Sequence, residues 1–440
     1  MEKQKCLVIG AAKSGCSVAR LLNDKGFEVL ITDMHLIEER KELESKGIQV
    51  IEGEHPTWLS DINYAFVVKN PGIKYTVPFI ASFVEKGVKI YTEVEVASWY
   101  APNFHYAAVS GTNGKTTITS MLYACLKEKG QALVGGNIGT PLSELVIQYG
   151  EEEKDVAIEL SNFQLLGCES FHPLVSVVCN LAPDHLDYMK SVEEYYESKM
   201  RIYQKQENDD WFLRNVDDEV VMQYAKNIKG VCIDFSMKRL DVDLYIKEGV
   251  VYLRDMLLFD SRILKVVGAH NQSNAMIAAC MAYKLGVSVA QIQKALSGFN
   301  GIEHRIEYIG ESKGIKFYND SKATNTQAAA IALASFDNNI LLLAGGHDKG
   351  IPFDEMGEYD ERVKCCFAFG ESKTKIAKLF TRHECVENLS EAIHAAYAIA
   401  KTGDVILLSP ACSSYDQFNN YEERGDLFRE EALKIIKGVN

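Results

Sequence analysis

The residues whose types and spacing could do chemistry are concentrated first in one glycine-rich segment, Gly111-Thr112-Asn113-Gly114-Lys115-Thr116-Thr117. An apolar run at 106–109 predicts a buried strand before it, and apolar residues at 118, 121, 122 and 125 predict a helix after it. The glycines allow backbone N–H groups to converge on phosphate oxygens, and the start of the helix adds positive potential. Lys115 can neutralise terminal phosphates and the Thr116 hydroxyl can bind Mg²⁺. We interpret the segment as a phosphate-binding loop, although Val109 stands where a strict P-loop has its first glycine.

Candidate ligands for a metal ion follow later strands of the same expected sheet. Glu159 lies at the end of the apolar run 155–160, directly before Ser161, and His185 follows the strand predicted at 174–180. The carboxyl ends of parallel strands meet at one edge of a sheet, so we expect these side chains near the phosphate loop. Carboxylate and hydroxyl oxygens suit Mg²⁺. A buried capping role for Glu159 and a structural role for His185 remain the alternatives.

A second glycine-rich turn, Gly10-Ala11-Ala12-Lys13-Ser14-Gly15, follows the strand predicted at 5–9. A helix and a second strand at 28–31 come next, and Asp33 stands just after that strand. This is the layout of a Rossmann-like nucleotide site. Because Ala12 replaces the middle glycine of the dinucleotide fingerprint, the turn favours a nucleotide diphosphate at the helix N-terminus. A further turn, Asn70-Pro71-Gly72, follows a strand at 64–68.

Amide, hydroxyl and cationic side chains gather at other strand and helix ends. Asn271 and Asn274 lie on one face at the start of an apolar helix, where their amides suit an adenine edge, with plain N-capping as the alternative for Asn271. Arg305 follows an interdomain linker and suits a phosphate. Three polar clusters each follow a predicted strand in the last third of the chain, at 319–325, 345–350 and 409–416. Lys349 and the hydroxyls of these clusters suit an anionic, amino-acid-like substrate.

The elements that must position these groups alternate between strand and helix along the whole chain. This alternation predicts mostly parallel sheets and the α/β class. We expect three α/β domains in series: a Rossmann-like domain at 1–97, a P-loop-type ATPase domain at 98–301 and a Rossmann-like domain at 302–440. The remaining strands are predicted at 88–91, 210–213, 316–318, 340–344, 365–369 and 405–408, and the helices at 192–204, 271–285, 289–299, 326–334, 373–380 and 389–401.

Composition narrows the class of protein. The chain has 440 residues and a formal net charge of −14, which argues against nucleic acid as a partner because binding it needs a basic surface. Neither a secretory segment nor an apolar stretch long enough to span a bilayer is evident, so we expect a cytoplasmic protein without membrane insertion. The 11 cysteines are scattered without a CxxC pair, which favours reduced core residues over a disulfide or zinc framework.

Taken in order, the motifs resemble those of one enzyme family. They are GTNGKTT at 111–117, DHLD at 184–187, YxxSKMRIY at 195–203, GAHNxxNA at 268–275, HR at 304–305, NDSKATN at 319–325 and SPAxxSxDxFxxYxxRGxxF at 409–428. The set resembles the ATP-dependent Mur ligases of peptidoglycan synthesis, and most specifically their D-glutamate-adding family. GTNGKTT alone indicates only the superfamily, whereas its combination with a Rossmann-like first domain and the last two motifs is more specific.

The resemblance implies addition of D-glutamate to UDP-N-acetylmuramoyl-L-alanine through an acyl phosphate, with ATP and Mg²⁺ as cofactors. Lys199 matches the family's carbamylated lysine, an anionic metal ligand, whereas periodicity alone gives only a solvated lysine. The implied catalytic residues are Lys115, His185 and Lys199, and the implied metal ligands are Thr116, Glu159, His185 and Lys199. The implied ATP contacts are Gly111, Thr112, Asn113, Gly114, Lys115, Thr116, Thr117, Asn271, Asn274, Arg305 and Asp320. Among the implied substrate contacts, Lys322, Thr324, Lys349, Ser414 and Tyr421 surround the D-glutamate, and Lys13, Ser14, Asp33, Asn70, Gly72, Asn137 and Ser161 complete the set.

Two alternatives accompany this interpretation. One is another amide ligase of the superfamily, such as an L-alanine- or diamino-acid-adding enzyme or folylpolyglutamate synthetase. The Rossmann-like first domain and the last motifs weigh against these. The other is a non-catalytic nucleotide- or NAD-binding module that uses the turn at 10–15, against which the metal-ligand set weighs. Ala12, Tyr415 and Tyr421 depart from the family pattern and bear on fine substrate geometry. We expect no obligate protein partner.

Overall fold

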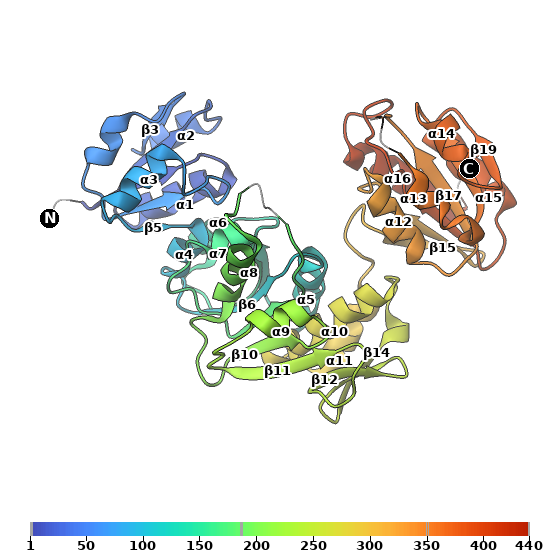
Figure 1. The fold of residues 1–440 in the computed structure, drawn as a ribbon, viewed down its shortest axis with the longest axis horizontal. Helices are drawn as coiled ribbons and strands as arrows, with labels where there is room; N and C mark the ends of the chain where they lie inside the picture. Colours follow the sequence, from blue (N-terminus) through green and yellow to red (C-terminus); the bar gives the residue numbers. More distant parts are fainter. Residues whose placement is uncertain (1–2, 185–187, 349, 351, 439–440) are drawn as a thin grey trace. The chain divides into compact units, whose positions relative to one another are not determined.

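The computed structural model describes residues 3–184, 188–348, 350 and 352–438. The chain divides into two compact units, residues 1–261 with 274–296, and residues 262–273 with 297–440. Its strands form three sheets in successive stretches of the sequence (Figure 1). Within the described part, no helix is long and apolar enough to cross a membrane. All 11 cysteines are described and unpaired, and most of them are buried.

The first sheet is parallel, with strand order β3-β2-β1-β4-β5. Alternate residues of β1 enter two cores, with Cys6 and Val8 on one face and Leu7 and Ile9 on the other. Strand order reverses beside β1, because β2 and β4 flank it, and ligands bind at such points in α/β sheets. The elements are β1 Lys5–Ile9, α1 Lys13–Asp24, β2 Glu28–Asp33, α2 Arg40–Ser45, β3 Gln49–Glu52, η1 Thr57–Asp61, β4 Phe66–Lys69, α3 Pro78–Glu85, β5 Ile90–Tyr91 and α4 Glu93–Ser98.

The second sheet has the order β14-β13-β12-β11-β10-β9-β6-β8-β7, and only its pairings β12–β13 and β13–β14 are antiparallel. β6 lies between β8 and β9, so the loops that follow these three strands meet at one edge. The elements are β6 Phe104–Ser110, α5 Lys115–Lys129, β7 Ala132–Gly136, α6 Leu142–Tyr149, β8 Lys154–Glu159, α7 Asn162–Leu165, β9 Val175–Val178, α8 Val192–Met200, η2 Arg201–Tyr203, β10 Trp211–Asn215, α9 Glu219–Tyr224, β11 Val231–Ser236, β12 Leu244–Lys247, β13 Val250–Leu253, β14 Met256–Asp260, η3 Ser261–Ile263, α10 Ala269–Lys284 and α11 Val289–Gly298.

The third sheet has the order β15-β16-β20-β17-β18-β19, and only β15 is antiparallel to its neighbour. The three polar clusters of the last third follow β16, β20 and β17, which are adjacent strands. They therefore share one edge of the sheet. The elements are β15 Glu307–Ser312, β16 Ile315–Asn319, α12 Thr326–Ala334, β17 Ile340–Gly345, α13 Asp354–Gly357, η4 Asp360–Arg362, β18 Val363–Phe369, α14 Lys373–Ala377, β19 His383–Cys385, α15 Leu389–Ile399, β20 Val405–Leu408 and α16 Tyr421–Lys437.

This architecture confirms the α/β class and the series of mostly parallel sheets, while the domain boundaries at 97 and 301 stay predictions. Several elements begin and end where the apolar patterns predicted, including β1, α12 and β20. The predicted C-terminal end of the helix at 192–204 is wrong. The α-helix α8 ends at Met200, and a 3₁₀ helix follows it at Arg201–Tyr203. The patterns predicted no element at 231–260 or 421–437, where the structure has four strands and α16.

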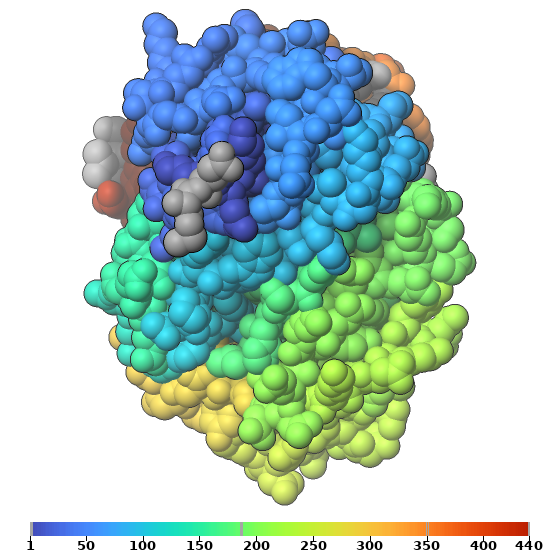
Figure 2. Space-filling model, turned by 90° about the vertical axis from the view of Figure 1, so that its left-hand side faces the viewer, coloured from blue at the N-terminus to red at the C-terminus, as the bar shows by residue number. Residues whose placement is uncertain are grey.

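Within the first compact unit, the first sheet and the second are joined by buried polar groups. The Ser143 hydroxyl donates to the Ser17 hydroxyl at 2.8 Å, and the Glu93 carboxylate accepts from the Ser143 N–H. Burial raises the pKa of Glu93 to about 7. Figure 2 shows the blue surface of the first sheet's residues running directly into the cyan and green surface of the central stretch.

Candidate active site

The phosphate loop between β6 and α5 is braced by the end of the neighbouring strand β9. Asn180 makes a two-way contact, in which its Oδ1 accepts from the Asn113 N–H at 2.8 Å and its Nδ2 donates to the Asn113 carbonyl at 3.0 Å. The Cys179 thiol donates to the carbonyls of Ser110 and Asn113, each at 3.0 Å. Gly111 has φ +141°, and a Cβ there would lie 2.3 Å from the Cys179 sulfur. The loop therefore needs glycine at 111 and owes its shape to residues about 70 positions away.

Two lysines converge on one carbonyl of this loop. Lys115 Nζ donates to the Gly111 oxygen at 2.9 Å and to the Thr112 oxygen at 2.8 Å. Lys199, on α8, donates to the same Gly111 oxygen at 2.8 Å and lies 4.8 Å from the ring centre of Tyr195. Lys199 is only 2% exposed, and burial, followed by the charge of Lys115, lowers its pKa to about 7. The solvated lysine that periodicity alone allowed is therefore wrong, because tertiary packing buries it against the loop.

Glu159, at the end of β8, has one carboxylate oxygen that is hydrogen-bonded and one that has no partner in the described structure. Its Oε1 accepts from Asn137 Nδ2 at 2.7 Å, and its backbone carbonyl accepts from the Asn137 N–H at 2.8 Å. Its Oε2 is buried without a hydrogen-bond partner in the described structure. Such an orphaned acceptor is costly unless something binds it. Lys13, at the start of α1, reaches the same region and donates to the Gly139 carbonyl at 3.0 Å.

The structure describes three of the four metal ligands that the sequence predicts. His185 lies outside the described residues. Among those described, no group of three or more His, Cys, Asp and Glu side chains gathers as a metal site. Thr116 is half-buried at the start of α5, where the first N–H groups of the helix have no acceptor within it. The Ser161 hydroxyl caps the N-terminus of α7, where it accepts a hydrogen bond from the Gln164 N–H in a capping box. The roles of these residues stay predictions.

The first sheet brings its predicted site residues together at the reversal of strand order. Gly10 has φ +94°, and a Cβ there would lie 2.6 Å from the Cβ of Asn70, so the two turns pack directly on each other. Asp33 braces the first turn, since its Oδ2 accepts from the Ala11 N–H at 2.7 Å. Asn70 Oδ1 accepts from the Gly72 N–H at 3.1 Å and shapes its own turn. Ser14 is half-buried in the first turn of α1.

The two asparagines of α10 occupy its first turns. α10 begins at Ala269, so Asn271 lies inside the helix and plain N-capping is wrong. Its Nδ2 donates to the Val267 carbonyl at 2.7 Å. Asn274 lies against the phosphate loop, because a Cβ on Gly114, whose φ is +86°, would be 2.9 Å from the Asn274 Oδ1. This close approach places Asn274 beside the phosphate loop.

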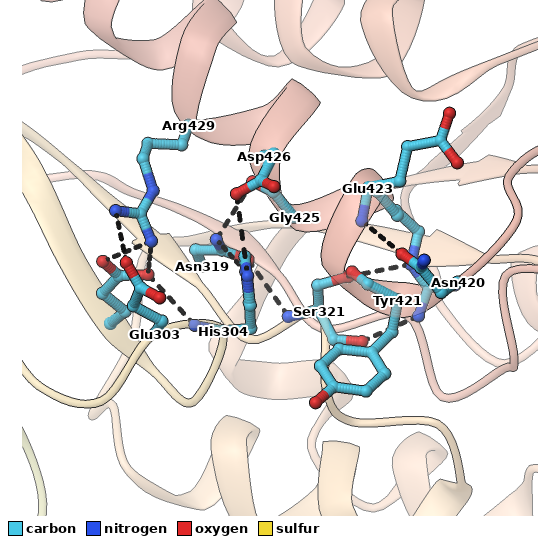
Figure 3. Close-up of polar contacts among 12 residues, drawn as sticks. Glu303, His304, Asn319, Ser321, Asn420, Tyr421, Glu423, Gly425, Asp426 and Arg429 are labelled. Atoms are coloured by element: carbon cyan, nitrogen blue, oxygen red, sulfur yellow. Dashed lines mark hydrogen bonds and ion pairs between the residues drawn. The ribbon is translucent and has the colours of Figure 1, made fainter. Parts of the chain in front are cut away.

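In the second compact unit, Asp320 is buried and already engaged. Its carboxylate accepts from the Ser409 hydroxyl at 2.8 Å and from the Ile306 N–H at 3.2 Å. Burial raises its pKa to about 7. The strand end therefore holds the segment that carries Arg305, whose side chain is exposed. Beside it, His304 contacts Asn319, whose Nδ2 also donates to the Gly425 carbonyl at 3.1 Å (Figure 3).

Arg424 ties together the loops that follow β16 and β20. This fully buried guanidinium donates to the Ser321 hydroxyl, to the Ser321 carbonyl and to the Cys412 carbonyl, at 2.8–3.0 Å. Burial lowers its pKa to about 10. Of the predicted D-glutamate residues, Lys322 directly follows Ser321 and lies 5.1 Å from the ring centre of Tyr421, and Ser414 is buried two residues after Cys412. Thr324 is half-buried at the same strand end, and Lys349 lies outside the described residues.

Sequence reasoning missed the bracing roles of Cys179, Asn180 and Arg424. Asn180 stands at a strand end two residues before the loop 182–184, which is a usable signal, whereas a buried thiol gives none. Arg424 falls in the terminal motif, but nothing in its spacing reveals that it is buried. These roles depend on which loops become neighbours.

Three family models match the chain in series. They are a Mur ligase MurD-like N-terminal domain at 4–92, a Mur ligase middle domain at 109–282 and a Mur ligase glutamate ligase domain at 304–412. The matches include residues of all three sheets.

Relatives align over the full length. The chain is 38% identical over 448 residues to the UDP-N-acetylmuramoylalanine--D-glutamate ligase of Bacillus subtilis (strain 168), covering 99% of each chain. It is 40% identical over 445 residues to the ligase of the same name from Geobacillus sp. (strain WCH70), covering 99% of this chain and 98% of that one. The crystal structure of UDP-N-acetylmuramate-alanine ligase MurC from Thermotoga maritima shares the fold, with a TM-score of 0.56, 18% identity and coverage of 99% and 100%.

Proposed function

The chain belongs to the ATP-dependent Mur ligase family, with relatives named UDP-N-acetylmuramoylalanine--D-glutamate ligase, and from this premise we propose that it joins D-glutamate to UDP-N-acetylmuramoyl-L-alanine through an acyl phosphate. The products are then ADP, phosphate and the extended muramoyl nucleotide of peptidoglycan precursor synthesis. The name shared by these relatives favours D-glutamate over the alternatives from the sequence, which are an enzyme for another amino acid and an NAD-binding module.

One observation carries the proposal. The loop at the start of α5 brings Lys115 and the buried Lys199 to the same backbone carbonyl, that of Gly111. A phosphate cradle needs cationic or proton-donating groups beside the developing charge, because phosphoryl transfer is catalysed chiefly by positioning and electrostatics. The N–H groups at the start of α5 and the third proton of Lys115 can serve that purpose.

The residues present fit a Mg²⁺ ion. Glu159 offers a buried carboxylate oxygen without a partner in the described structure, and Thr116 offers a hydroxyl at the start of α5. Lys199 fits carbamylation, because a lysine with a pKa of about 7 supplies the neutral amine that attacks CO₂. Its carbamate would add an anionic oxygen ligand, and His185 completes the proposed set. When bound, the metal would neutralise charge on the transferring phosphoryl group.

The reaction then follows from the chain's own groups. A carboxylate oxygen of the muramoyl substrate attacks the γ-phosphorus of ATP, and ADP leaves. The D-glutamate amine attacks the activated carbonyl carbon, the C–O bond to phosphate breaks, and the amine loses a proton. Lys115 and Arg305 are proposed to stabilise the phosphates. Lys13, Ser14, Asp33 and the turn 70–72 are proposed to hold the UDP end, with Asn137 near the muramoyl group.

The amino acid is proposed to sit at the shared edge of β16, β20 and β17. Lys322, Thr324, Lys349, Ser414 and Tyr421 come from the loops after these strands and from the start of α16. A substrate with two carboxylates needs several donors spread over its length, including a cation for the distal charge. D-glutamate meets this need, whereas L-alanine lacks the distal group.

An isotope experiment tests the whole proposal. The purified protein is given ATP, D-glutamate and UDP-N-acetylmuramoyl-L-alanine whose carboxylate carries ¹⁸O, and the released phosphate is analysed by mass spectrometry. We expect one ¹⁸O atom in the phosphate, because a carboxylate oxygen forms the bond to phosphorus. Parallel reactions replace D-glutamate by L-glutamate, L-alanine or L-lysine. Unlabelled phosphate would refute the acyl phosphate, and a preference for another amino acid would refute the specificity.

A further inference from the structure

A second buried lysine lies at the end of β4, remote in sequence from the phosphate loop. Lys69 is 1% exposed and directly precedes the turn Asn70-Pro71-Gly72. In the described structure no carboxylate lies within ion-pair distance of it. Its Nζ instead donates to the carbonyls of Asn70 and Pro71, each at 3.3 Å, and to the Tyr188 hydroxyl at 3.4 Å.

Tyr188 belongs to the other sheet's part of the compact unit and completes the contact. Its hydroxyl donates to the Ile73 carbonyl at 2.7 Å and lies 3.2 Å from the Pro71 carbonyl. Its ring packs on Phe163 of α7, with ring centres 4.2 Å apart. Tyr188 therefore links α7 to the turn of the first sheet, and Lys69 contacts both the Tyr188 hydroxyl and the turn.

The chemistry around Lys69 favours an ammonium. Burial lowers its pKa to about 7. The contacts of Nζ nevertheless favour the protonated form. All three of its hydrogen-bond partners are oxygen atoms, and the ring centre of Tyr75 lies 4.4 Å from Nζ. An ammonium has three protons for three oxygens, whereas a neutral amine would point a lone pair at one of them. The ring face adds a cation–π attraction.

Only one side of the turn is held in this way. Its other side packs on Gly10, the first residue of the turn at the proposed UDP site. The turn is therefore held by the Lys69 and Tyr188 contacts behind it together with the Asn70 N–H, which donates to the Ile9 carbonyl at 2.7 Å. Without those two side chains, the Pro71 carbonyl would lose the Lys69 and Tyr188 donors and the Asn70 carbonyl would keep the Ile73 N–H, so the turn would shift to regain a donor.

We propose that Lys69 is a positioning residue for the UDP-linked substrate, which fixes the turn 70–72 against Tyr188 so that the turn and the glycine-rich turn at 10–15 form one preorganised surface. This inference rests on the proposed function. Lys69 touches no reacting atom, so it acts on binding of the nucleotide sugar and leaves ATP binding unchanged.

The experiment measures steady-state ADP release for Lys69→Met, Lys69→Arg, Tyr188→Phe and the double variant. Lys69→Met keeps the length of the side chain and removes its charge. We expect the KM for UDP-N-acetylmuramoyl-L-alanine to rise about tenfold, as for loss of one donor to the half-buried carbonyls of the turn, with the KM for ATP unchanged. Tyr188→Phe should raise the same KM. In the double variant, the fold-increase of this KM should be smaller than the product of the two single increases, because both residues act on one turn. Lys69→Arg should restore part of the loss.

Lys89→Met is the matched control. Lys89 pairs with Glu169 at 2.8 Å on the surface of the same compact unit, and both side chains are about half exposed. Its loss should leave every KM unchanged.

The outcomes separate the inference from the proposed function. An inactive wild type would refute the proposed function itself. An active wild type with unchanged KM in Lys69→Met and Tyr188→Phe would overturn the inference alone. Equal rises in both KM values, accompanied by a lower melting temperature, would also overturn it, since that is the pattern of a structural residue. If Lys69→Met does not fold, Tyr188→Phe decides, because it removes only a hydroxyl.

Discussion

Replacing Lys199 tests whether its burial serves carbamylation. Burial and the charge of Lys115 lower the pKa of Lys199 from its ordinary value to about 7. At pH 7 about half of these side chains hold a neutral amine, compared with roughly one in three thousand for an unperturbed lysine. The structure thus raises the reactive form about 10³-fold. A carbamate there would place an anionic oxygen beside the phosphate loop.

We expect Lys199→Ala to lower ADP release by about 10²–10³-fold, the usual effect of removing one group that stabilises transition-state charge. The fold should survive, because the Gly111 carbonyl keeps Lys115 as a donor. Lys205→Ala, at an exposed lysine six residues further along, is the control. Its activity should equal that of the wild type.

The assay also observes the modification directly. Protein equilibrated with ¹³C-bicarbonate should show a carbamate signal by NMR, absent in Lys199→Ala and present in Lys205→Ala. Because only the neutral amine reacts, signal and activity should fall together as the pH drops from about 8 to 6, through the pKa of about 7. Full activity of a folded Lys199→Ala protein, or a carbamate signal that persists in it, would refute the reasoning.

Three further changes probe other parts of the molecule. Lys115→Ala should reduce ADP release by about 10²-fold or more while the melting temperature stays within a few degrees, and normal turnover would contradict the phosphate-loop assignment. Gly111→Ala should abolish thermal stabilisation by ATP, because its Cβ would meet the Cys179 sulfur at 2.3 Å, whereas Gly130→Ala, at the end of the same helix with open space around it, should not. Glu93 has a pKa raised to about 7 in the fold, so the folded state binds the extra proton and the free energy of unfolding should fall as pH rises from about 4.5 to 7. Urea unfolding of Glu93→Gln should show less of this fall, by about 3 kcal/mol, and an unchanged pH dependence would remove Glu93 as its source.

Sequence alone determined the features that depend on near neighbours along the chain. The strand at 5–9, the helix at 326–334 and the strand at 405–408 follow from apolar runs and periods, since side-chain spacing directly reflects strand or helix geometry. The phosphate loop was predicted for the same reason, because strand, glycine-rich turn and helix are consecutive. Motif order was enough to identify the family.

Only the tertiary structure decided what surrounds these elements. Lys199 and Lys69 are both lysines in mixed or short segments, and no periodicity shows that one is packed against Gly111 and the other against Tyr188. Likewise, the antiparallel strands at 244–260 have short mixed patterns that tertiary pairing completes. Burial, and with it a pKa near 7 or an orphaned oxygen such as that of Glu159, is a property of neighbours brought together by sheet order. The local sequence specifies the strands and loops, whereas the order of strands specifies which loops share an edge and therefore which side chains can act together.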